Sequence, residues 1–256
     1  MISKLFFFLT NNILLNNIFI KLGIDSILTS RLGIYKRIKI DTNLSPQQMA
    51  GFSEKPTVQE AIDKIHLKLE TLVQENLREG DRILDIGCGA GAYLKKWEGK
   101  FDLTGIDIND DMVNEARKRI PSANIILDNF LNYDFNHKFK LIYSVSVLEF
   151  IPPSRLMAFF RKVHLLLEPD GKLLIQYPHA LNFKDTLYPD LYYVEYSPRK
   201  IEHELRNNYK IITHEHCFDG RIIDLYDPKP YEPGNRTFKN GYLLIAEPKV
   251  KIKIFL

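Results

Sequence analysis

The spacing of apolar residues along this chain changes repeatedly between the period of a helix and that of a strand. Residues 56–79 place apolar side chains three and four positions apart, as on one face of an amphipathic helix. Short apolar runs typical of buried strands then alternate with further helical segments. We expect strands near residues 82–86, 102–107, 123–127, 140–146, 171–177, 209–216 and 241–247, and further helices near 91–98, 110–119, 154–167 and 198–207.

This alternation predicts an α/β fold built on one mostly parallel sheet, with helices on both faces and right-handed crossovers. The segment between the last two strands has no helical spacing, so we expect those strands to pair antiparallel. The predicted sheet therefore has seven strands, of which the last runs against the others. A chain of 256 residues can bury a core of this kind without disulfides or metals.

A glycine-rich stretch, RILDIGCGAGA at 82–92, begins with the first expected strand. Gly87, Gly89 and Gly91 allow positive φ and let a ligand approach the backbone where no Cβ stands in the way. With a helix expected behind it, this turn would form a cradle for a nucleotide-like ligand. The stretch also satisfies the dinucleotide fingerprint, with Asp107 about twenty residues further on, so the glycines alone leave two ligand classes open.

Asp85, two residues before the first glycine, favours S-adenosylmethionine over a dinucleotide. A carboxylate at this strand tip would bind the ammonium group of that cofactor through a charge-assisted hydrogen bond, and it would repel a pyrophosphate. Residues 83–91 resemble, without a gap, the first motif of the class I S-adenosylmethionine-dependent methyltransferases, in particular the type 11/25 domains. Further segments resemble the family's later motifs in the same order, at 103–109, 124–130, 140–149 and 166–175.

The resemblance implies a Rossmann-like fold, S-adenosylmethionine as the cofactor and a set of cofactor-binding positions. Asp107 ends the second strand, where the family's acid accepts both ribose hydroxyls. Asp128 stands where the family's acid receives the adenine amino group, and the backbone after it faces the ring. The implied cofactor-binding residues are Asp85, Gly87, Cys88, Gly89, Gly91, Asp107, Ile108, Asp128, Asn129, Phe130 and Ser144.

The implied chemistry is displacement at the sulfonium methyl, and an acceptor hydroxyl would also need a base. Many relatives carry a histidine after the fourth strand, but this chain has Phe150 there. The candidate catalytic residues are therefore His179, just beyond the fifth strand, and Glu149. A histidine bonded to loop backbone, and a carboxylate that caps a helix or contacts the cofactor, stay open as structural alternatives. His214 and His216 share a strand face but lack further ligands, so we expect no metal.

Several segments lie outside the predicted sheet. The N-terminal extension, 1–56, has apolar clusters and seven basic against three acidic residues, an excess of +4. It suits a cap over the substrate pocket, a helix at a membrane surface, or a cleaved leader. The methyltransferase-like domain is expected at 57–248, with aromatic-rich insertions at 178–197 and 218–240 and a tail at 249–256. The insertions suit a lid over the acceptor, although simple loop packing is an alternative.

Composition narrows the partners and the compartment. A formal net charge of +3 gives no support to a nucleic-acid partner. Two cysteines make no disulfide framework, so we expect a cytoplasmic protein, with membrane contact through 1–56 left open. The expected function is methylation of an O or N atom of a small molecule, such as a lipid, quinone or glycan intermediate. The alternatives are a protein that binds S-adenosylmethionine without turnover and a nicotinamide-dependent oxidoreductase.

Overall fold

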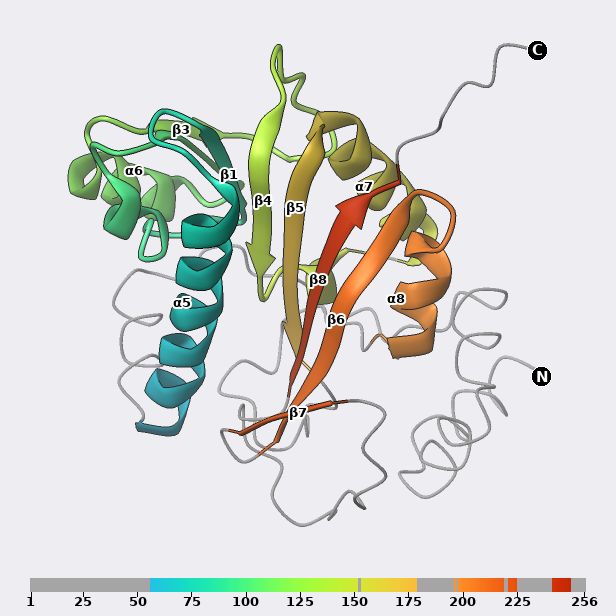
Figure 1. The fold of residues 1–256 in the computed structure, drawn as a ribbon. Helices are drawn as coiled ribbons and strands as arrows, with labels where there is room; N and C mark the ends of the chain where they lie inside the picture. Colours follow the sequence, from blue (N-terminus) through green and yellow to red (C-terminus); the bar gives the residue numbers. More distant parts are fainter. Residues whose placement is uncertain are drawn as a thin grey trace, which may run out of the picture.

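The computed structural model of the chain describes residues 56–151, 153–178, 196, 198–218, 221–224 and 241–249. They form one sheet with the strand order β3-β2-β1-β4-β5-β8-β6-β7 and helices on both faces (Figure 1). The strands are β1 (Arg82–Ile86), β2 (Asp102–Asp107), β3 (Asn124–Leu127), β4 (Phe139–Val145), β5 (Leu167–Pro178), β6 (Tyr209–Phe218), β7 (Arg221–Asp224) and β8 (Gly241–Pro248). The helices are α5 (Pro56–Asn76), α6 (Asp110–Arg119), α7 (Pro153–Leu166) and α8 (Pro198–Leu205), with the 3₁₀ turns η1 (Leu94–Trp97) and η2 (Leu148–Phe150).

The predicted topology is confirmed, with one addition. Strands β1 to β5 pair in parallel, and β8 runs antiparallel between β5 and β6, as expected from the missing helix between the last two predicted strands. The addition is the short strand β7, which pairs antiparallel with β6 inside the segment 218–240 that was expected to be an insertion. The sheet therefore has eight strands instead of seven.

The prediction of a helix at 91–98 is wrong, because the chain forms only the 3₁₀ turn η1 there. Gly91 and Gly99 both have positive φ, at 75° and 79°, and bound this segment on either side. Positive φ interrupts a right-handed helix, and the residues between the two glycines are too few for a stable one. The glycine loop is consequently not followed by the N-terminus of a long helix, and its backbone amides lack that dipole.

Helix α6 begins directly after the tip of β2 and fixes the chain there. Its N-cap is Asn109, whose side chain accepts a hydrogen bond from the backbone of Met112 at 3.1 Å. Acidic residues occupy its first turn and basic residues its last, which complements the helix dipole. Because this cap lies two residues beyond Asp107, it also determines where the end of β2 points.

Two apolar clusters hold the helices on the two faces of the sheet. One face packs against α5 and α6, and the other against α7 and α8. Aromatic rings dominate the α7 side, where Phe159 is fully buried 5.3 Å, centroid to centroid, from Phe130. No helix within the described ranges combines the length and the hydropathy needed to cross a bilayer.

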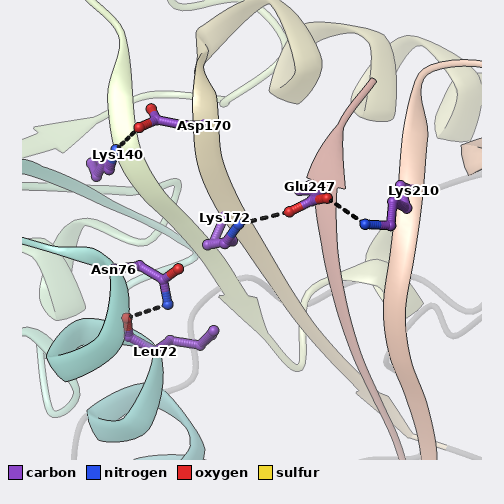
Figure 2. A network of polar contacts seen from close by, with 7 residues as sticks. All are labelled: Leu72, Asn76, Lys140, Asp170, Lys172, Lys210 and Glu247. Atoms are coloured by element: carbon purple, nitrogen blue, oxygen red, sulfur yellow. Dashed lines mark hydrogen bonds and ion pairs between the residues drawn. The ribbon is translucent and has the colours of Figure 1, made fainter. Parts of the chain in front are cut away.

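A chain of ion pairs connects the strands far from the β1 tip (Figure 2). Glu247 on β8 lies 2.7 Å from Lys172 on β5 and 3.0 Å from Lys210 on β6. These lysines lower the pKa of Glu247 through hydrogen bonding. Glu247 therefore ties the antiparallel strand to both of its parallel neighbours. Partly exposed pairs of this kind stabilise a fold only weakly, so the apolar clusters carry most of the stability.

We predict that Phe159→Ala lowers the free energy of unfolding by about 3–5 kcal/mol, because it empties a fully buried site on α7. Met157, on the same helix, is 58% exposed, so Met157→Ala should change stability by no more than about 0.5 kcal/mol. Chemical denaturation followed by circular dichroism measures both. Equal losses in the two variants would contradict this assignment of the core.

Candidate functional site

The carboxyl ends of β1, β2 and β4 meet at one edge of the sheet. The pairing register places Asp85 between Gly105 on β2 and Tyr143 on β4, and it places Ser144 beside Ile86. Ligands of open α/β sheets bind beyond this edge. The glycine loop, the end of β2 and the loop after β4 therefore surround one common region.

The glycines of this loop serve two different purposes. Gly87 has φ +74°, and a Cβ there would lie 2.2 Å from Val147 Cγ2, so only glycine lets the loop pack against the segment after β4. Gly91 is similar, since its Cβ would lie 2.7 Å from Ile120 Cδ1. Gly89 differs because its Cβ would have nothing within 4 Å. The backbone at Gly89 thus borders open space in which a ligand can approach it.

Asp107 is held at this edge by two backbone amides. Its Oδ2 accepts a hydrogen bond from Gly89 N at 2.8 Å, and its Oδ1 accepts one from Asn109 N at 3.0 Å. Each carboxylate oxygen can accept a further hydrogen bond, and the side chain is partly exposed. The loop and the α6 cap therefore orient a carboxylate whose remaining acceptor capacity faces outward.

Asp85 differs from Asp107 in its burial and in its hydrogen bonding. It is 2% exposed, and its Oδ2 has no hydrogen-bond partner among the described residues. Burial raises the pKa of this carboxyl well above its usual value, and the charge of Asp107 adds to the increase. The nearby Tyr143 hydroxyl lowers the pKa of Asp85 in part. Its contact with Asp85 is not a well-formed hydrogen bond, since Tyr143 Oη has no hydrogen-bond partner among the described residues.

Helix α5 adds groups to this region that sequence reasoning missed. The His66 ring contacts the Tyr93 ring in a tilted arrangement with centroids 4.6 Å apart, and Tyr93 lies edge-on to Tyr143 at 6.3 Å. Burial and the nearby Lys96 lower the pKa of His66, and its buried Nε2 has no partner among the described side chains. The available signal was a histidine next to buried Ile65 on an otherwise amphipathic helix.

The other residues that the resemblance implies for cofactor binding divide into two groups. Ile108 is 54% exposed at the end of β2, and Asp128 and Asn129 are exposed after β3. By contrast, the side chains of Phe130 and Ser144 are buried. The Ser144 hydroxyl donates to Ile86 O at 3.1 Å, and the Phe130 ring packs in the core.

Cys88 also points inward. Its side chain is buried, and burial together with the charges of Asp85 and Asp107 raises the pKa of its thiol. A Cβ on Gly105 would lie 2.8 Å from Cys88 Sγ, so the thiol fills space against β2. Any contact of Cys88, Phe130 or Ser144 with a ligand at this edge would therefore run through the backbone.

The loop after β4 contains the second buried acid of the edge. Among the described residues, Ser146 is the one non-glycine with a positive φ, 55°, and its N–H and hydroxyl both donate to Gln176 Oε1 at 3.0 Å. Three residues later Glu149 is 3% exposed, and its Oε2 has no partner in the described part of the chain. Burial raises the pKa of Glu149 to about 8.

The candidate base His179 lies outside the described residues. His214 is placed in a hydrogen-bonded chain: its Nε2 is 2.8 Å from Tyr177 Oη, and its Nδ1 is 2.8 Å from Glu202 Oε1. This chain ties α8 to the sheet. Within the described ranges, no group of three or more His, Cys, Asp or Glu side chains is placed to hold a metal ion.

This edge fits a ligand that carries an ammonium group next to a sugar diol. The unpartnered Asp85 Oδ2 can accept from an ammonium group, and Asp107 can accept from two hydroxyls. The open space at Gly89 lies between these carboxylates along the chain. S-adenosylmethionine has both groups, so the residues present fit the cofactor that the sequence implies.

Comparisons with known proteins agree with this geometry. Residues 83–171 match a family described as a methyltransferase domain. A dTDP-3-amino-3,4,6-trideoxy-alpha-D-glucopyranose N,N-dimethyltransferase from Streptomyces venezuelae is 31% identical over 75 residues, which are 29% of this chain and 32% of that protein. A malonyl-[acyl-carrier protein] O-methyltransferase from Ilyobacter polytropus is 28% identical over 185 residues, 70% of this chain and 61% of that protein. The chain thus spans less than two thirds of the length of these relatives.

A solved structure shows the same fold. The N-methyltransferase NodS from Bradyrhizobium japonicum, in complex with S-adenosyl-L-homocysteine, superposes with a TM-score of 0.56. It is 17% identical in sequence, and the alignment covers 76% of this chain and 89% of that structure.

We predict that Gly87→Ala lowers the free energy of unfolding by about 3 kcal/mol, the sum of left-handed backbone strain and the clash with Val147. Gly89→Ala is the matched control, because it has the same strain without the clash and should cost about 1 kcal/mol. Thermal unfolding of both variants measures the difference. If Gly87→Ala were the milder change, the packing described for this loop would be incorrect.

Proposed function

Because the chain belongs to the class I S-adenosylmethionine-dependent methyltransferases, we propose that it transfers the methyl group of this cofactor to an O or N atom of a small molecule. The observation that carries the proposal is the pair of carboxylates at the tips of neighbouring strands, on either side of an open glycine loop. When bound, S-adenosylmethionine supplies an activated methyl group on a sulfonium. The protein then has to bind the cofactor, orient the acceptor toward the methyl group and accept the proton that the acceptor loses.

In this proposal each carboxylate has a distinct binding role. Asp85 accepts from the ammonium group of the amino-acid end, and Asp107 accepts from the ribose hydroxyls while two backbone amides hold it in place. Ile108 offers exposed apolar surface to the adenine ring, and Asp128 accepts from the adenine amino group. Gly89 lets the ligand approach the backbone. The backbone N–H of Asn129 donates to Asp128 Oδ1 at 2.6 Å, so Asn129 orients the carboxylate that accepts from the adenine amino group.

The proton of the acceptor is assigned to Glu149, with His179 as the second candidate. Glu149 lies on η2, beyond the end of β4, where an acceptor would approach the methyl group. With a pKa near 8, its carboxyl gains or loses a proton close to physiological pH, which suits general base catalysis. Its Oε2 has no hydrogen-bond partner among the described residues, so no internal hydrogen bond there competes with the substrate that accepts the methyl group.

The acceptor class follows from the relatives and from the segments around the site. The relatives are named as an N,N-dimethyltransferase of an amino sugar, a malonyl-[acyl-carrier protein] O-methyltransferase and a sphingolipid C9-methyltransferase. These names support a small-molecule or lipid-like acceptor, and they give no support to a protein that only binds the cofactor. Most of the segments 178–197 and 218–240, and nearly all of 1–56, for which the sequence predicts lid, cap or membrane-surface roles, lie outside the described residues. A cytoplasmic location stays part of this proposal.

We predict that Asp107→Asn weakens binding of S-adenosylmethionine roughly 30- to 150-fold, about 2–3 kcal/mol. The new amide NH₂ would face the backbone N–H of Gly89, and the neutral side chain would no longer offer a charged acceptor to the ribose hydroxyls. The control is Asp102→Asn at the other end of β2, where the carboxylate forms only an exposed pair with Arg82. Isothermal titration calorimetry measures both affinities. Unchanged affinity in Asp107→Asn would count against the proposed binding mode.

For catalysis, we predict that kcat of the native enzyme rises with pH through about 8, as Glu149 loses its proton. Glu149→Gln should lower kcat by roughly 100-fold or more and abolish this rise, with cofactor affinity unchanged. His179→Ala is measured in parallel with labelled methyl transfer. If Glu149→Gln keeps the pH profile and His179→Ala removes it, the base is His179 and the assignment to Glu149 is wrong.

A further inference from the structure

Asp85 is a buried carboxyl group without a cation to balance its charge. It is 2% exposed, and its Oδ2 has no hydrogen-bond partner among the described residues. No ion pair joins Asp85 to a lysine or arginine of the described chain. An unpaired charge in such a place is very costly, so a buried carboxyl with these surroundings keeps its proton.

The groups that face Asp85 from the surrounding elements do not supply a positive charge. They are Tyr143 on β4, Asp107 on β2, Cys88 in the glycine loop and Tyr93 after it. Asp63 and His66 on α5 lie near Tyr93, and Lys96 on η1 lies near His66. His66 is kept neutral by burial, which lowers its pKa, and Lys96 is paired with Glu70. The remaining groups are hydroxyls, a thiol and further carboxylates.

We propose that Asp85, Tyr143 and Tyr93 form a proton-exchanging receptor for a ligand ammonium group. Asp85 is protonated in the free protein, and an ammonium group that binds beside Oδ2 displaces that proton to solvent. The inference rests on the proposed function, since it assigns the ammonium group to the amino-acid end of the cofactor. It adds that cofactor affinity is linked to pH through one residue of the cradle.

The step balances in protons and in charge. The O–H bond of the Asp85 carboxyl breaks, the proton passes to bulk water or buffer, and the carboxylate left behind pairs with the ammonium group. The Asp85 side chain is neutral before binding, and afterwards its carboxylate is balanced by the ammonium group, so exchange at this position leaves no unpaired charge on Asp85. Tyr143 and Tyr93 keep their protons because burial raises the pKa of both hydroxyls. Tyr143 Oη is therefore available to donate to the new carboxylate.

Isothermal titration calorimetry with S-adenosylhomocysteine tests this proposal, because this compound keeps the amino-acid end and needs no turnover. At pH 6.5 its amino group, with a pKa of about 8, arrives protonated. Titrations in two buffers of different ionisation enthalpy should report the release of close to one proton per ligand. The association constant should rise about tenfold between pH 6 and pH 7.

Three controls isolate Asp85. Methylthioadenosine, which lacks the amino-acid end, should bind the native protein without proton release. Asp107→Asn should weaken binding of S-adenosylhomocysteine but keep the proton release, because the ribose side of the site does not exchange the proton. Asp85→Asn should lose both the proton release and the pH dependence. If this variant does not fold, the comparison of the two ligands on the native protein still decides.

The outcomes separate this inference from the proposed function. Binding of S-adenosylhomocysteine without net proton release, and with equal affinity at pH 6 and pH 7, would overturn the receptor and leave the methyltransferase proposal standing. Failure of both S-adenosylmethionine and S-adenosylhomocysteine to bind the folded protein would overturn the two together.

Discussion

The candidate site depends on how two carboxylates at the tips of adjacent parallel strands are solvated. Asp107 accepts hydrogen bonds from two backbone amides, whereas Asp85 is buried with an oxygen that has no partner in the described chain. The first arrangement stabilises a charge within the protein. The second favours the neutral carboxyl until a cation binds beside it, and in the proposed function this difference assigns a cation to one end of the site and hydroxyls to the other.

The sheet and its helices place these groups at fixed distances. The parallel register brings Asp85 between Gly105 and Tyr143, and the Asn109 cap of α6 holds the end of β2. Gly87 lets the loop after β1 pack against Val147 in the loop after β4. A larger side chain at Gly87 would therefore displace Val147, because the two loops are closely packed at this point.

Much of this arrangement is readable from sequence, since local patterns determine it. The strand positions, α6 and the motif from Asp85 to Gly91 follow from apolar spacing and glycine placement. The absence of the helix expected at 91–98 was not predicted, because it depends on the positive φ of Gly91 and Gly99. The approach of His66 to Tyr93, and the burial of Glu149, depend on which helix face meets which loop, and one sequence does not contain that information.

Asp85 and Glu149 are both buried acids at one sheet edge, but they differ in the groups that surround them. Asp85 lies near the Tyr143 hydroxyl and the Asp107 carboxylate, so the proposed receptor has it lose its proton when a cation binds. The raised pKa of Glu149 comes from burial, without a contribution from a neighbouring charge. A carboxyl of that kind stays poised near neutral pH whether or not a cation is bound at Asp85. In the two proposals, the same sheet edge thus provides one acid that responds to ligand charge and another that exchanges a proton with an acceptor.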